Sequence, residues 1–320
     1  MSEALARAME LWHEYRATAP RGSIAETRRH YEQFITRFVV PSDVVTRPVD
    51  AGGVAAQWVW IDGQMPSSRV IIYVHGGGFT TGSATVYTEL ASYLSRDSGA
   101  PILVIDYRLA PEFPFPAAID DVVRAYRWVL STGTDHRSVA IAGDSAGCSL
   151  LIGAMLCLRS EGLPLPAACA CASPVVDLEA LGDSMDTNAG RDPVVARSVV
   201  RTLAALYLDG HDPRDPLVSP VHADLTGMPP MLVQVSTDEV LLDDAKSLVR
   251  QAQQFGVDVT FEQTFGVPHV WHLFASFLPE ARSALASMAA FCVTHTRIST
   301  CDASIGPNGD VATSSRPHEE

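Results

Sequence analysis

The segment Gly143-Asp144-Ser145-Ala146-Gly147 constrains the fold of this chain more than any other. The small and apolar residues 138–142 before it predict a strand, and the run 146–158 after it predicts a helix. A serine in a tight turn between a strand and a helix has its hydroxyl group lifted clear of the sheet, at the N-terminal end of the helix. The two glycines leave room for the strand and the helix to pass close to each other. We therefore predict that Ser145 is a nucleophile.

A second motif, His75-Gly76-Gly77-Gly78-Phe79, follows the apolar run 70–74. Glycines after a strand can present backbone N–H groups without obstruction, which stabilises the oxygen of a tetrahedral intermediate as it gains charge. The alternatives are a flexible loop and a phosphate cradle. A phosphate cradle would have Lys with Ser or Thr after the glycines, and neither pattern is present. The motif therefore favours an oxyanion hole.

Alternating strand and helix patterns organise the rest of the chain. The Ala51-Gly52-Gly53 turn predicts a hairpin at the start, and helical runs separate most of the later strands. We expect an α/β fold with a mostly parallel eight-stranded sheet and helices on both faces. The expected strands lie near residues 44–50, 54–61, 70–75, 101–107, 138–143, 167–173, 231–236 and 257–264, and the expected helices near 83–97, 117–131, 146–160, 240–255 and 279–296.

Two segments depart from this alternation and predict a cap over the sheet. Residues 1–40 have apolar side chains at helical spacing in two runs separated by Pro20-Arg21-Gly22. Residues 180–215 form an insertion with a helical run near 194–208. We therefore divide the chain into N-terminal cap helices at 1–40, a catalytic domain at 41–296 that contains the insertion, and a tail at 297–320. The polar, aperiodic composition of the tail predicts disorder.

Composition excludes several classes of function. The net charge of −14 argues against nucleic acid and an anionic membrane surface as partners. No apolar run reaches the roughly 18 residues that span a bilayer, and the N-terminus does not resemble a signal peptide. The six cysteines lack the spacing of a metal site. We expect a cytoplasmic protein with no metal.

A serine hydroxyl group needs a base, and the base needs an acid that orients it. Ligands gather at the carboxyl ends of parallel strands, so both partners are sought after the last two strands. Asp238 and Glu239 follow one of them, and the residues alone leave the choice between these two open. His269 follows the last expected strand, at residues 257–264, and is our candidate base. His272 and His75 are interpreted as packing and loop-bracing residues, and Asp243 and Asp244 as favourable charges at a helix N-terminus.

Four motifs in this order resemble the bacterial esterase branch of the hormone-sensitive lipase family of α/β-hydrolases, over roughly residues 40–296. They are His75–Phe79, Asp106–Glu112, Phe115–Asp121 and Gly143–Gly147. The resemblance implies the α/β-hydrolase fold with a helical cap and hydrolysis of carboxylic esters without metal or cofactor. A homodimer is compatible with this branch, although nothing in the sequence indicates one.

The resemblance also implies roles for individual residues. Ser145 would be the nucleophile and His269 the base, because Gly266-x-x-His269 with Trp271 is similar to the family's G-x-x-H-x-F. Gly77, Gly78 and Ala146 would donate oxyanion-hole N–H groups. The family's D-P-L-x-D motif aligns with residues 239–243, which places Glu239 in the position of the acid, with Asp238 as the alternative. Arg108 and Glu112 would brace the loop below the glycines.

The expected function is therefore that of a serine carboxylesterase acting on small esters with short to medium acyl chains. One alternative is a lactone hydrolase or a deacetylase of an acetylated metabolite, because the same catalytic group serves both. An alternative from another class is a non-catalytic small-molecule receptor on the same fold, similar to the gibberellin receptors of plants.

Overall fold

The computed structural model describes residues 2–20, 22–64 and 68–298. Within them, eight strands form one sheet in the order β1-β2-β4-β3-β5-β6-β7-β8. Only the pairs β1–β2 and β2–β4 are antiparallel, and the other five pairs are parallel. The predicted α/β fold and mostly parallel sheet are thus confirmed. The strands are β1 Val44–Asp50, β2 Ala55–Ile61, β3 Val70–Val74, β4 Ile102–Ile105, β5 Val139–Asp144, β6 Ala168–Ala172, β7 Met231–Ser236 and β8 Val259–Thr264.

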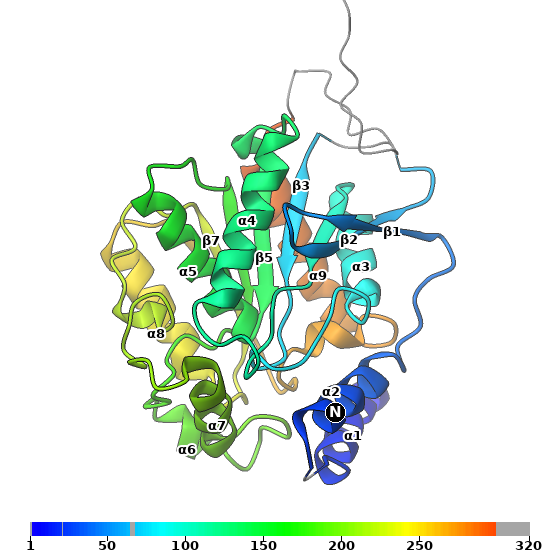
Figure 1. Cartoon of the computed structure of the whole chain (residues 1–320). Coiled ribbons are helices and arrows are strands. Elements are labelled where there is room, and N and C mark those ends of the chain that lie inside the picture. Colours follow the sequence, from blue (N-terminus) through cyan, green and yellow to red (C-terminus); the bar gives the residue numbers. More distant parts are fainter. Residues whose placement is uncertain (1, 21, 65–67, 299–320) are drawn as a thin grey trace, which may run out of the picture.

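The helices cover both faces of this sheet (Figure 1). Helices α4, α5 and α8 pack on one face, whereas α3 and α9 pack on the other. Alternate residues of β3 divide between the two cores, with Ile72 on one face and Ile71 on the other, which explains why this strand is a continuous apolar run. The α-helices are α1 Glu3–Ala17, α2 Ile24–Ile35, α3 Thr88–Ser98, α4 Ala117–Ser131, α5 Ala146–Ser160, α6 Ser184–Thr187, α7 Arg197–Leu208, α8 Leu242–Gln254 and α9 Pro279–His295.

Helix α3 begins at Thr88, five residues later than the sequence predicts. Gly82 has a φ of +100°, and the N–H of Ala84 donates to the Asp106 carboxylate. The N–H of Thr88 then closes a turn onto the carbonyl oxygen of Thr85. Residues 83–87 therefore form loop hydrogen bonds in place of the first helical turn.

Helices α1 and α2 lie together near one end of the sheet, and α6 and α7 lie near the same end (Figure 1). The side chain of Ser23 accepts from Glu26 N–H, and the Glu26 carboxylate accepts from Ser23 N–H, which starts α2 with a capping box. Trp12 of α1 packs on Phe34 of α2 with their ring centroids 4.4 Å apart, and it also meets the edge of Phe274. Aromatic packing therefore holds the N-terminal helices together and against Phe274, in the segment after β8.

The segment between β6 and β7 leaves the sheet, as expected, and contains α6, α7 and the short 3₁₀ helix Pro220–His222. A second 3₁₀ helix precedes β5 at His136–Ser138, and a third spans Trp271–Phe274. None of the helices in the described ranges is long and apolar enough to cross a bilayer. Of the predicted tail, Arg297 donates its N–H to the carbonyl oxygen of Arg137 (2.8 Å), and residues 299–320 lie outside the described residues.

Candidate active site

Ser145 occupies the turn between β5 and α5 in a strained conformation, with φ 51° and ψ −121°. Backbone strain of this kind costs about 1–3 kcal/mol and persists only where the surroundings enforce it. Here the N–H of Ser145 donates to the carbonyl oxygen of Ala172 (2.9 Å) at the end of β6. A Cβ atom at Gly147 would lie 2.1 Å from the Val74 carbonyl oxygen, so only glycine lets α5 start this close to β3.

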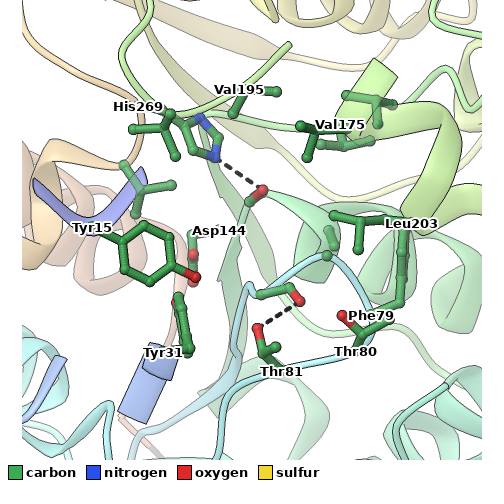
Figure 2. Close-up of a pocket in the computed structure, with 18 of the residues that line it drawn as sticks. Tyr15, Tyr31, Phe79, Thr80, Thr81, Asp144, Val175, Val195, Leu203 and His269 are labelled. Carbon is green, nitrogen blue, oxygen red and sulfur yellow. Dashed lines mark hydrogen bonds between the residues drawn. The ribbon is translucent and has the colours of Figure 1, made fainter. Parts of the chain in front are cut away.

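His269, from the loop after β8, joins Ser145 to Glu239, from the loop after β7. The His269 Nε2 atom lies 3.0 Å from Ser145 Oγ, and the Nδ1 atom lies 2.6 Å from Glu239 Oε2. The dashed line from His269 in Figure 2 marks the bond to the serine. All three side chains are buried, and only 9% of Ser145 is exposed. Three loops far apart in sequence thus form one hydrogen-bonded line.

The two acidic candidates occupy different surroundings. Asp238 accepts from Thr237 Oγ1, and its carboxylate lies 3.5 Å from the Arg191 guanidinium. Glu239 is 1% exposed and contacts the imidazole of His269. Between the two residues that the sequence leaves open, the structure therefore brings Glu239 to His269.

The other two histidines near the site have separate partners. His75 donates its Nδ1–H to the carbonyl oxygen of the neighbouring Gly76 (2.7 Å), and its ring stacks on Tyr107. His272 Nε2 bonds to Gln234 Oε1 (2.9 Å). Burial lowers the pKa of His75 to about 4 and that of His272 to about 3, so both are neutral at pH 7.

Three backbone N–H groups near Ser145 are available to a ligand in the cavity. In the part of the chain that the structure describes, no protein acceptor is recorded for the N–H of Gly77, Gly78 or Ala146, and all three residues line one cavity. Gly77 has a φ of +108°, and its carbonyl oxygen accepts from Thr81 Oγ1 (2.8 Å), the second dashed line in Figure 2. Ala146 begins α5, where the helix dipole adds positive potential.

The loop that follows β4 supports the glycine motif differently from our expectation. Tyr107 donates its hydroxyl to the carbonyl oxygen of His75 (2.8 Å). Glu112 pairs with Arg28 of α2, and the Nε atom of Arg28 donates to the carbonyl oxygen of Thr80 (2.8 Å). Arg108 instead pairs with Asp121 of α4. Glu112 is therefore connected to the loop of the glycine motif through Arg28, whereas Tyr107 donates a hydrogen bond to the motif directly.

The cavity over Ser145 has a volume of about 290 Å³. Trp12 and Tyr31 line it from α1 and α2, and Val200 and Leu203 line it from α7. Figure 2 shows Tyr15 and Tyr31 on one side of the cavity and Leu203 on the other. The lining of this cavity is mostly apolar. The cavity volume is close to about 300 Å³, the lower end of the range for small-molecule pockets.

Several residues that the sequence analysis did not select support this arrangement. Ser173 donates to Glu239 Oε1 (2.8 Å), and Asp192 accepts the N–H of Val240 (3.0 Å). Asn188 donates to the carbonyl oxygen of Glu239 (2.8 Å). Asp244 accepts from the N–H of Val176 (2.9 Å), which adds an anchoring role to its place at the helix N-terminus. These are single polar residues without a motif, so no sequence signal distinguishes them.

Asp144 lies buried beneath the glycine motif. Its carboxylate accepts from the hydroxyl groups of Tyr73 and Tyr87 (3.0 Å each) and from the N–H of Gly76 (2.9 Å). Burial raises its pKa to about 6, although these hydrogen bonds oppose the shift. Asp144 therefore holds the glycine loop in place from below.

One group of potential metal ligands exists in the described ranges, formed by Asp177, Glu179 and His222. Asp177 already accepts from the N–H groups of Glu179 and Leu181 (3.0 Å each). None of the three ligand candidates lines the cavity over Ser145. This group is therefore separate from the candidate active site.

The pH dependence of the site follows from His269. Burial alone would lower its pKa, but the hydrogen bond and charge of Glu239, together with the charges of Asp192 and Asp144, raise the pKa above the ordinary value of 6.5. Only the neutral imidazole can accept a proton, so a role of His269 as the base predicts that activity falls as the pH drops through this raised pKa. We expect the acidic limb of kcat/KM, measured from about pH 5 to 9, to have its midpoint above 6.5. A midpoint below that value would contradict the proposed influence of Glu239.

Comparisons with known proteins identify the family of this chain. The profile of the family described as alpha/beta hydrolase fold matches residues 71–273. An acetyl-hydrolase from Streptomyces hygroscopicus is 42% identical over 285 residues, which cover 89% of this chain and 93% of the relative. An esterase from Acinetobacter venetianus is 33% identical over 82% of this chain and 86% of its own length. The crystal structure of an esterase from the bacterial hormone-sensitive lipase family has a TM-score of 0.90 and 43% identity, and the match covers 92% of this chain and 99% of that one.

Proposed function

The chain belongs to the hormone-sensitive lipase family of α/β-hydrolases and is a carboxylic ester hydrolase, and we propose that it cleaves esters through Ser145, His269 and Glu239. The observation that carries this proposal is the hydrogen-bonded line from Ser145 Oγ through His269 to Glu239 Oε2, with distances of 3.0 and 2.6 Å. A serine, an imidazole and a carboxylate in this order are what acyl transfer by a serine requires.

In the proposed first half-reaction, His269 Nε2 takes the proton of Ser145 as the oxygen attacks the ester carbonyl. Glu239 holds the Nδ1–H tautomer and stabilises the imidazolium ion. Collapse of the tetrahedral intermediate forms the acyl-enzyme, and His269 gives the proton to the departing alcohol. Water then attacks the acyl-enzyme by the same route, and His269 returns the proton to Ser145 as the acid departs.

We propose that Gly77, Gly78 and Ala146 form the oxyanion hole. Their N–H groups surround the cavity beside Ser145 and have no recorded protein acceptor in the described residues. Donors fixed in advance by the backbone cost no reorganisation during the reaction, and one such donor contributes about 10²–10³ in rate.

We also propose that α1, α2 and the insertion at 180–215 act as a cap that limits the substrate. Side chains from α1, α2 and α7 line the cavity over Ser145, and Leu203 packs so near Gly78 that a Cβ atom there would lie 2.4 Å from Leu203 Cδ1. An apolar cavity of about 290 Å³ favours short to medium acyl chains.

A chain-length series tests this function. The purified protein is expected to hydrolyse 4-nitrophenyl esters with a maximum of kcat/KM at acyl chains of about two to eight carbons, and to lose roughly tenfold or more at sixteen, because longer chains exceed the cavity. Initial rates with a Ser145→Ala variant give the background. A maximum at the longest chain would contradict the role of the cap, and no turnover of any ester would contradict the function.

The name of the Streptomyces relative gives one observation in favour of a second candidate, removal of an acetyl group from a small metabolite. Within the same series, a kcat/KM that falls from the acetyl to the butanoyl ester would favour the deacetylase, whereas a kcat/KM that is equal or higher for the butanoyl ester would favour the broader carboxylesterase. A cytoplasmic location stays a prediction from the sequence, lactone hydrolysis stays an alternative, and a homodimer stays compatible with the family resemblance.

A further inference from the structure

Ser173 connects the loop of the acid to the loop of the base. It follows β6 and is fully buried. Its hydroxyl group donates to Glu239 Oε1 (2.8 Å) and accepts the backbone N–H of Val270 (3.1 Å), the residue after His269. A hydroxyl has one proton to donate, so the carboxylate and the amide together determine its orientation.

Ser173 and Val270, which this second hydrogen bond joins, both have strained backbone conformations. Ser173 has a φ of +47° and Val270 a φ of +46°. A β-branched residue such as valine is a rare outlier in the left-handed region and persists only where its surroundings enforce the conformation. The bond from Val270 N–H to Ser173 Oγ is one contact that enforces it. This bond therefore helps to set the direction in which the chain presents His269.

Two hydrogen bonds to one oxygen atom restrain the orientation of the Glu239 carboxylate. Its Oε1 atom accepts from Ser173 Oγ and from the N–H of Ser236 (2.8 Å each), which leaves Oε2 for His269. A glutamate has one more rotatable bond than an aspartate, so its carboxylate needs more restraint to stay in one orientation. Ser173 supplies part of this restraint through a side chain, and Ser236 supplies the rest through the backbone.

We propose that Ser173 is a positioning residue for ester hydrolysis, which orients the Glu239 carboxylate and the main chain at His269 together; this inference rests on the proposed function. The residue does not touch the substrate. It acts by keeping Nδ1 of His269 on Oε2 and Nε2 on Ser145, where small displacements have large consequences.

Replacement of Ser173 tests this role. The Ser173→Gly variant removes the hydroxyl group at a backbone conformation that glycine adopts readily, so the fold is retained. We expect kcat to fall about 10- to 100-fold while KM changes less than about threefold, because catalytic geometry is lost and the cavity is not. Ser173→Ala should give the same result, a lower kcat with little change in KM. Ser92→Ala is the matched control, because this buried serine bonds only to the carbonyl oxygen of Glu89 in its own helix.

A double-mutant cycle with Glu239→Ala separates positioning from a general structural effect. If Ser173 acts through the carboxylate, Ser173→Gly in the Glu239→Ala background should cost at least about fivefold less than in the natural chain. The same fold-loss in both backgrounds would overturn the proposal, as would full activity of both Ser173 variants or an increase in KM at unchanged kcat. If Ser145→Ala or Glu239→Ala kept full activity, the proposed function itself would be wrong, so the two failures are distinguishable.

Discussion

Replacing Ser145 by alanine is expected to lower kcat for a 4-nitrophenyl ester by about 10⁵- to 10⁶-fold, because the acyl-enzyme can no longer form. The change removes one oxygen atom and leaves Cβ in place, so the strained turn, with its φ of 51°, keeps the same steric demands. Residual activity above a few per cent of the natural rate would contradict the assignment of Ser145 as the nucleophile. Steady-state kinetics with a short-chain ester measure the loss.

A fluorophosphonate probe gives an independent readout of the same residue. We expect the natural chain to be labelled at Ser145 and the Ser145→Ala variant to stay unlabelled, because only an activated serine reacts with the probe. A receptor on this fold would bind small molecules without being labelled. Failure of the natural chain to react would therefore favour the non-catalytic alternative.

Glu239→Gln is expected to lower kcat by about 10³- to 10⁴-fold, as loss of the orienting acid does in other serine hydrolases. The glutamine is nearly the same size, but it cannot stabilise the imidazolium ion, and its amide nitrogen could turn toward Nδ1 and favour the wrong tautomer. The change should also move the acidic limb of the pH profile toward lower pH, because the carboxylate of Glu239 is what raises the pKa of His269.

Asp238→Asn is the matched control for this change. Asp238 precedes Glu239 in the chain and pairs at 3.5 Å with Arg191, so its replacement should change kcat less than about threefold. The reverse result, a large loss at Asp238 and a small one at Glu239, would show that the acid is the other carboxylate and that the observed bond to His269 is not the one used in catalysis.

The fold could be predicted from local patterns because they are strong and repeated. Buried strands such as 70–74 are continuous apolar runs, and amphipathic helices such as 117–131 separate them, so their alternation alone implies a parallel sheet. Helices α4, α5 and α9 begin at the predicted residues, and α3 is the main exception. Helix α3 starts at Thr88 because the preceding residues bond to Asp106 and to one another, and such contacts with distant residues have no local signal.

By itself, the sequence determined the order of the elements and the turn in which Ser145 lies, because glycine spacing and apolar periodicity depend on neighbours along the chain. Only the tertiary structure decided which carboxylate meets His269. Asp238 and Glu239 are adjacent and chemically alike, and the direction of each side chain depends on how β6, β7 and the insertion pack around it. The contact between Ser173 and Glu239 also depends on the tertiary structure, because the two residues are 66 positions apart in the sequence.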